Sequence, residues 1–177
     1  MSFDIVLQPC SLSDRMKTVK HPATGKSIKV PDDQLTASEV AAVNDLLQRT
    51  KATVEGEFRC HSVRFRDKGS LELFMDGLDG SEPCEGGMAC LRGYTPQTIE
   101  FLHELSRVGN LMLMPIDGED LEIVTSDSQR KQVHARHPDV LIAGTPGALG
   151  VLLEKGVEAW EAYRDRVVPG RRGAPKK

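Results

Sequence analysis

Three cysteines and one histidine are the residues of this 177-residue chain whose types best suit metal chemistry. They are Cys60, His61, Cys84 and Cys90. Zinc prefers thiolate and imidazole ligands, but structural zinc sites place paired ligands about two to four residues apart. Neighbouring residues of a strand point to opposite faces, so Cys60 and His61 could not both reach one ion. The spacing argues against a metal site, and we expect neither a metal nor a cofactor.

A nucleophilic thiol is the second chemistry that the residues suggest. Cys84 precedes Gly86 and Gly87, whose backbone amides could approach a substrate oxyanion. Glu85 argues against this role, because an adjacent carboxylate raises the pKa of a thiol. Nothing in the sequence places a histidine beside Cys84. We therefore expect a non-catalytic protein, and we keep a thiol- or metal-dependent enzyme centred on Cys84 and Cys90 as the alternative.

Residues 75–93 combine five glycines, four acidic residues, Pro83 and two cysteines. This composition predicts one long loop, and long loops in compact chains are often functional. The acidic residues lack the spacing of a calcium-binding EF-hand. We expect them to form an acidic surface for a basic protein partner, together with two acids of a later turn. The residues expected at this surface are Asp76, Asp79, Glu82, Glu85, Glu119 and Asp120.

Basic residues gather in a polar segment, 127–137, and in the last nine residues, 169–177. They support a second alternative, a nucleic-acid-associated protein. Aromatic residues make up only 5% of the chain and do not interleave with these basic residues, so few aromatic side chains are placed for nucleic-acid bases to stack on. The formal net charge of −3 provides no general attraction to phosphate. The composition therefore argues against nucleic acid and favours a protein partner.

Cap and turn patterns predict the elements that position these residues. Thr36 with Glu39 forms a capping box, and Thr-Pro pairs at Thr95 and Thr145 have the N-cap and first-turn residues that begin helices. We expect helices over 36–49, 95–109, 126–137 and 145–167, and strands over 3–7, 16–30 (a hairpin), 58–66, 71–75, 111–116, 121–124 and 139–143. Strand hairpins dominate the first half, so we predict an α+β fold with a mostly antiparallel sheet and a long C-terminal helix.

The hairpin over 16–30 has a basic surface, with Lys17, Lys20, Lys26 and Lys29. Lysines on a solvent-exposed strand edge resist pairing with other chains, so we interpret them as a solvated edge. This interpretation assigns no partner to the hairpin.

Composition sets the broad class of the protein. Hydrophobic residues make up 39% and charged residues 28% of the chain, near the averages of globular proteins. The N-terminal residues lack the basic and apolar regions of a signal peptide, and no window is apolar enough for a membrane span. We expect a cytoplasmic protein with reduced thiols and no membrane partner, with one globular domain over 1–168 and a flexible basic tail over 169–177. The sequence does not determine the oligomeric state.

Overall fold

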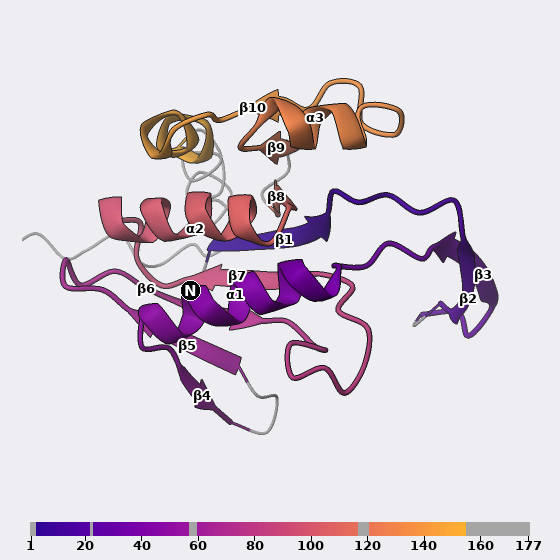
Figure 1. Cartoon of the computed structure of the whole chain (residues 1–177), viewed down its shortest axis with the longest axis horizontal. Helices are drawn as coiled ribbons and strands as arrows, with labels where there is room; N and C mark the ends of the chain where they lie inside the picture. The colour runs from indigo at the N-terminus through magenta and orange to yellow at the C-terminus, as the bar shows by residue number, and fades with distance from the viewer. Residues whose placement is uncertain (1–2, 22, 57–59, 117–120, 155–177) are drawn as a thin grey trace, which may run out of the picture.

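The computed structural model describes residues 3–21, 23–56, 60–116 and 121–154. Within these ranges the fold is α+β, with a mostly antiparallel eight-stranded sheet, a separate two-stranded sheet and helices (Figure 1). The predicted fold class is therefore confirmed. Glu119, Asp120, the expected tail over 169–177 and the end of the expected C-terminal helix lie outside the described residues.

The ten described strands form two sheets. They are β1 (Phe3–Pro9), β2 (Met16–Lys20), β3 (Ser27–Pro31), β4 (Thr53–Glu55), β5 (Cys60–Arg64), β6 (Ser70–Phe74), β7 (Gly87–Leu91), β8 (Leu111–Pro115), β9 (Ile123–Val124) and β10 (Leu141–Ile142). The large sheet has the order β10-β9-β8-β1-β7-β6-β5-β4, and β2 pairs only with β3. Among the described strands, β9 and β10 form the one parallel pair.

Strand β1 lies in the interior of the large sheet, between β7 and β8. Ile5 is paired with Ala89 of β7 on one side and with Pro115 of β8 on the other. Residues along β1 alternate between buried and half-buried, as the period of two in a strand requires. The buried series begins with Phe3 and Ile5 and contributes to the main hydrophobic core.

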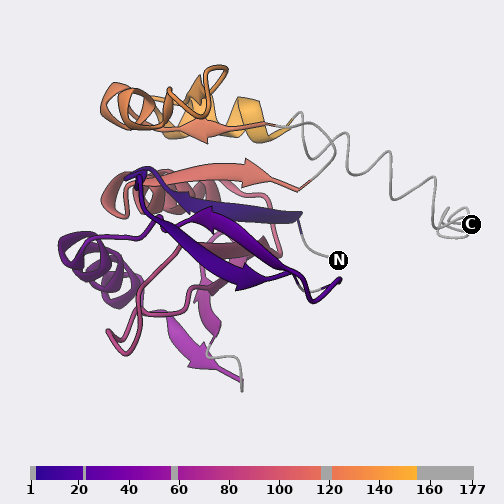
Figure 2. The same cartoon turned by 90° about the vertical axis from the view of Figure 1, so that its right-hand side faces the viewer.

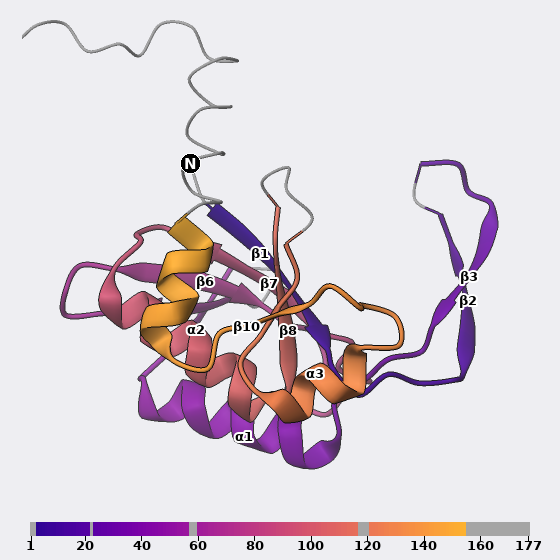
Figure 3. The same cartoon turned by 90° about the horizontal axis from the view of Figure 1, so that it is seen from above.

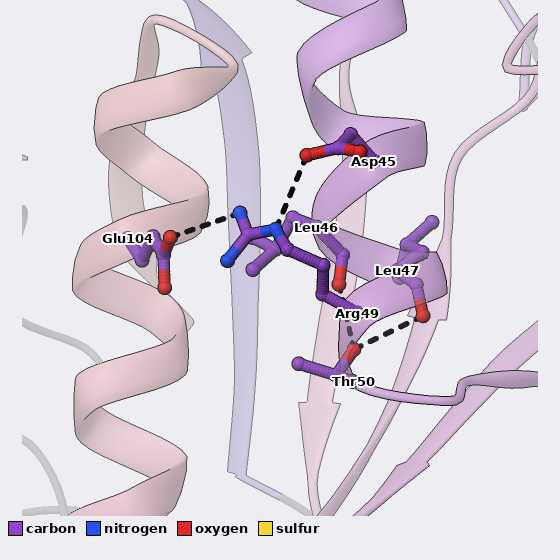
Figure 4. A network of polar contacts seen from close by, with 6 residues as sticks. All are labelled: Asp45, Leu46, Leu47, Arg49, Thr50 and Glu104. Atoms are coloured by element: carbon purple, nitrogen blue, oxygen red, sulfur yellow. Dashed lines mark hydrogen bonds and ion pairs between the residues drawn. The ribbon is translucent and has the colours of Figure 1, made fainter.

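Two long helices cover this core on one face of the sheet. They are α1 (Ala37–Arg49) and α2 (Pro96–Val108), which Figure 3 shows on the same side of β1, β7 and β8. Arg49 joins them, since its Nε lies 3.1 Å from Asp45 Oδ2 and its Nη2 lies 3.0 Å from Glu104 Oε1 (Figure 4). At the end of α1, the Thr50 hydroxyl donates to the carbonyl oxygens of the helix's last turn.

The predicted helix starts are confirmed. Thr36 and Glu39 form a complete capping box, and the Thr95 hydroxyl accepts from the backbone N–H of Thr98. A shorter helix, α3 (Asp127–Val133), has Ser126 as its N-cap and ends before the predicted limit at 137. A further helix occupies residues 146–154, and the Thr145 hydroxyl accepts from the N–H of Ala148. None of the helices of the described residues is both long and apolar enough to cross a membrane.

Strands β2 and β3 form an arm, defined here as residues 15–31, that projects from the main body (Figures 1 and 3). The hairpin prediction is confirmed, and the sheet it forms is separate from the large one. Backbone hydrogen bonds continue the pairing at both ends, from Asp32 N to Arg15 O and from His21 N to Lys26 O. The pairing of β2 with β3 is therefore extended by one backbone hydrogen bond at each end.

The expectation of one continuous loop over residues 75–93 is wrong. Residues 87–91 form β7, which is hydrogen-bonded to β1 on one side and to β6 on the other. Gly87 fits here because a Cβ would lie 2.1 Å from the carbonyl oxygen of Phe74, so only glycine permits this close strand approach. Strand β4 was also missed, since its three residues are all exposed and form only an edge.

Candidate functional site

The acidic loop of the structure comprises residues 75–86, which connect β6 to β7. Its four carboxylate residues are all exposed, whereas Leu78 and Cys84 are buried, with 6% and 2% of their surfaces accessible. The exposed residues are Asp76, Asp79, Glu82 and Glu85. The loop thus directs its charges to solvent and the apolar side chains of Met75, Leu78 and Cys84 into the core.

Two hydrogen bonds anchor the acidic loop to the body of the protein. Asn44 of α1 donates from Nδ2 to the carbonyl oxygen of Leu78 at 2.7 Å. The backbone N–H of Leu35 donates to the carbonyl oxygen of Cys84 at 2.8 Å. Together with the buried Leu78 and Cys84 side chains, these contacts fix the loop at two separate points. The segment is therefore held in one shape more firmly than its glycine content suggests.

A tight turn sets the spacing of the carboxylates. Gly77 has a φ of +79°, and a Cβ there would lie 2.6 Å from the carbonyl oxygen of Glu82. Asp79 Oδ1 accepts hydrogen bonds from the backbone N–H and the hydroxyl of Ser81, at 3.0 and 2.6 Å. An aspartate that bonds the backbone two residues ahead is a common stabiliser of turns. Asp79 therefore shapes the loop as well as contributing charge.

A small cleft of about 160 Å³ lies beside the acidic loop. Val54 of β4 and His61 of β5 line one part of it, and Asp76, Asp79 and Glu82 line another. Most small-molecule sites are about 300 to 1,000 Å³, so this cleft suits the end of one side chain. Carboxylates at its wall favour a cationic group such as an ammonium or a guanidinium.

The fourth carboxylate, Glu85, already has a cationic partner. It forms an ion pair with Lys17 Nζ of β2, where the arm lies next to the loop. Asp76 and Glu82 form no ion pair within the part of the chain that the structure describes. The structure thus separates the four carboxylates of the acidic loop into one that binds the arm, one that shapes the turn and two that remain for a partner.

All four cysteines are buried and have free thiols. Burial raises the pKa of Cys84, opposed by the Gly86 N–H and reinforced by the charges of Asp76 and Glu85. Burial also raises the pKa of Cys90 to about 12, with further contributions from Asp4. A thiol must become a thiolate to act as a nucleophile, so this geometry does not activate either residue.

The predicted loop over residues 75–93 included Cys84 and Cys90, but both side chains are buried. Cys84 packs in the main core and Cys90 lies within β7. Across the described residues, no three or more histidine, cysteine, aspartate or glutamate side chains are grouped so that they could hold a metal ion. The thiol- or metal-dependent enzyme therefore gains no support from the geometry.

Several basic residues of segment 127–137 are engaged in contacts within the chain. Arg136 binds Asp33, and His137 Nδ1 lies 2.6 Å from Glu122 Oε1. Arg130 lies 3.9 Å from Asp127 of the same helix. These contacts reduce the positive charge that the segment offers to a nucleic acid.

Sequence reasoning missed a larger hollow of about 430 Å³ between α2 and the helix over residues 146–154. Its apolar lining includes Ile99, Pro146 and Val151. The Tyr94 hydroxyl, which also lines it, donates to the carbonyl oxygen of Gly150. Burial, aided by the charge of Glu154, raises the pKa of Tyr94 to about 12, so the phenol stays protonated as a donor.

Asn44 and Lys17 are further residues of the acidic site that sequence reasoning did not assign. Asn44 directly follows the buried Val43 in α1, so helical periodicity could have placed it at the edge of the buried face. Nothing local to Lys17 indicates its contact with Glu85, because the two lie on separate elements.

Comparisons with known proteins identify no relative. No protein-family model matches the chain, no curated protein matches it, and no solved structure matches it.

Proposed function

We propose that this chain is a small cytoplasmic, non-catalytic binding module, of an adaptor or immunity type, that presents its acidic loop to a basic protein partner. The observation that carries the proposal is the pair of exposed carboxylates, Asp76 and Glu82, beside a cleft of about 160 Å³. The loop that bears them is anchored through Leu78 and Cys84.

Anchoring matters because a binding surface that is already ordered loses less conformational entropy when a partner binds. A lysine or arginine of the partner would enter the cleft, with Asp76 and Glu82 as its counter-charges. Charge complementarity of this kind accelerates association and excludes acidic competitors more than it increases affinity. The partner should therefore bind faster at low ionic strength.

The test is capture of partners from a lysate of the native host by the purified chain. The wild type is compared with the variant Asp76→Lys with Glu82→Lys, and bound proteins are quantified by mass spectrometry. Asp76 and Glu82 are preferable to Asp79, whose side chain shapes the turn. We expect the wild type to retain a basic protein in a salt-sensitive manner and the variant to lose it.

The matched control is Glu100→Lys with Asp139→Lys, which makes the same charge change at exposed residues outside the acidic loop. It should capture the partner as the wild type does. If the loop variant retained its partner as well as this control, the acidic loop would not be the binding surface.

A further inference from the structure

The arm is the most basic segment of the described structure. Its residues 15–31 contain five basic side chains and no acidic one: Arg15, Lys17, Lys20, Lys26 and Lys29. The two strands pack mainly against each other, and neither joins the large sheet. Figure 2, in which the arm faces the viewer, shows the two strands side by side. An isolated two-stranded sheet is marginally stable in water, so a partner that covers the arm would stabilise it.

The two faces of the arm differ in their surroundings. Residue pairing places Lys17, Val19, Ile28 and Val30 on one face, and the Lys17–Glu85 ion pair turns this face toward the acidic loop of the same chain. The opposite face is called here the outer face of the arm. Its residues are Met16, Thr18, Lys20, Ser27, Lys29 and Pro31, and all of them are exposed.

The outer face combines charge with apolar surface. Lys20 and Lys29 form no ion pair within the described residues. Met16, two positions before Thr18 on the same face, has 53% of its surface accessible. A partner for this face should therefore supply carboxylates and some apolar surface. A protein surface offers both.

The acidic loop of the same chain has the complementary charge. Residues 75–91 contain four carboxylates and no lysine or arginine. The contact between Lys17 and Glu85 shows that arm and loop already match at the point where they lie next to each other. One molecule therefore carries two complementary surfaces side by side, which a two-fold interface between identical copies requires.

We infer that the partner of the outer face is a second copy of this chain, in a two-fold dimer in which each arm lies on the acidic loop of the other copy. Lys20 and Lys29 of one copy are placed against Asp76 and Glu82 of its partner, and the same contacts repeat by symmetry. This inference rests on the proposed function, because it identifies the basic surface that binds the acidic loop as the arm of a second copy.

Nucleic acid is the competing occupant of a basic arm, and two observations disfavour it. Residues 15–31 contain no phenylalanine, tyrosine or tryptophan on which a base could stack. The exposed carboxylates of the acidic loop lie close to the base of the arm, as the Lys17–Glu85 contact shows, and would repel phosphate.

The test measures self-association of the purified full chain by sedimentation equilibrium. We expect the wild type to dimerise, with a Kd that rises roughly tenfold or more between about 0.05 M and about 0.5 M sodium chloride, because the contacts are charged and exposed. The arm variant, Lys20→Glu with Lys29→Glu, and the loop variant, Asp76→Lys with Glu82→Lys, should each be monomeric. Circular dichroism spectra like that of the wild type would show that each variant remains folded.

Mixing the two variants restores complementarity in both halves of the interface. Each charge reversal changes the net charge by two, so the arm variant goes from −3 to −7 and the loop variant from −3 to +1. The mixture should form a heterodimer. A control with the same net charge as the arm variant, Arg107→Glu with Lys131→Glu, should bind the loop variant much more weakly, since one half of that interface is repulsive.

A wild type that remains monomeric at every concentration would overturn the inference, as would a dimer that both variants retain. Binding of duplex DNA or RNA by a monomeric wild type, lost in the arm variant, would assign the arm to nucleic acid instead. The proposed function can hold when the dimer fails. If the wild type is monomeric and only the loop variant loses a captured basic protein, the acidic loop binds a different protein and only the dimer is wrong.

Discussion

Arg136 and Asp33 lie 103 positions apart in the sequence, yet Arg136 Nη1 is 2.9 Å from Asp33 Oδ2 and 3.2 Å from Oδ1. Asp33 follows the second strand of the arm, and Arg136 follows α3. The Asp33 carboxylate also accepts from the backbone N–H of Ser13 at 2.6 Å, and Arg136 Nη2 donates to the Ser13 carbonyl oxygen. One guanidinium therefore fixes both ends of the arm to the body of the protein.

Replacing Arg136 by methionine should destabilise the protein, because the nearly buried Asp33 carboxylate would lose its counter-charge. The Arg136 side chain is about a third exposed, so we expect a loss of about 1–3 kcal/mol in the free energy of unfolding rather than the larger value of a fully buried pair. Urea denaturation measures it. The control is Arg130→Met, which removes an exposed pair and should cost under about 0.5 kcal/mol. Equal losses in the two variants would contradict this role of Arg136.

Asp67 should make the stability of the protein depend on pH. Partial burial acts to raise the pKa of Asp67, but hydrogen bonds from Gln97 N, Gly69 N and Thr95 Oγ1 outweigh it and lower the pKa below its usual value. A carboxyl whose pKa is lower in the folded state stabilises that state above its unfolded pKa of about 4. This stability is lost as the pH falls through the folded pKa.

Thermal unfolding of the wild type and Asp67→Asn across pH 7 to pH 2, roughly the range over which carboxyls titrate, checks this prediction. The wild type should have the higher Tm at neutral pH, by a margin that stays constant down to about pH 4 and narrows below it. Asp139→Asn, at an exposed position, should show no such narrowing. A margin for Asp67→Asn that does not change with pH would mean that its charge does not contribute.

The thiols should react slowly with alkylating reagents in the native protein. Burial raises the pKa of Cys10 to about 12, with a further contribution from Glu39, and Cys90 is raised to about the same value. At pH 8 such a group is thiolate only about one part in ten thousand. We expect each thiol to react at least roughly 100-fold more slowly than a peptide thiol, and all four to react at the peptide rate in urea.

Mass spectrometry after timed iodoacetamide treatment separates the four sites. The rate at Cys84 is the decisive one. If Cys84 of the native protein reacted faster than a free peptide thiol, the thiol-dependent enzyme would again be a candidate.

The helices could be predicted from sequence because their signals are local. Thr36, Thr95 and Ser126 each accept from a backbone N–H three residues ahead, and those pairs are visible as short spacings in the chain. The period-two pattern of β1 is similarly local. The acidic loop was found by composition, and the exposure of its four carboxylates agrees with that composition.

The remaining features depend on contacts between distant segments. Strand β7 has a glycine-rich start that resembles a loop, and only its neighbours β1 and β6 define it as a strand. The burial of Cys84 likewise depends on the core beneath the loop. The pairing of Lys17 with Glu85 joins residues 68 positions apart, so no spacing rule reveals it.

Two glycines of the acidic loop, Gly80 in its middle and Gly86 at its end, allow its rigidity to be tested. Gly86 has a φ of +103°, and a Cβ there would lie 2.1 Å from the carbonyl oxygen of Leu7 in β1. Gly80 has a φ of +76° but no atom within 4 Å of the corresponding position. Gly80→Ala should therefore cost only the backbone strain of an alanine at positive φ, about 1–2 kcal/mol.

Gly86→Ala adds a clash with backbone that cannot move without separating β7 from β1, so its cost should exceed about 3 kcal/mol. Urea denaturation of both variants measures the difference. The Gly80→Ala variant should also still capture a basic partner, because the turn of the acidic loop keeps the carboxylates of Asp76 and Glu82 in place. Similar costs for the two alanines would mean that the loop moves freely where it enters β7, and the proposed binding surface would then lack the order that we assign to it.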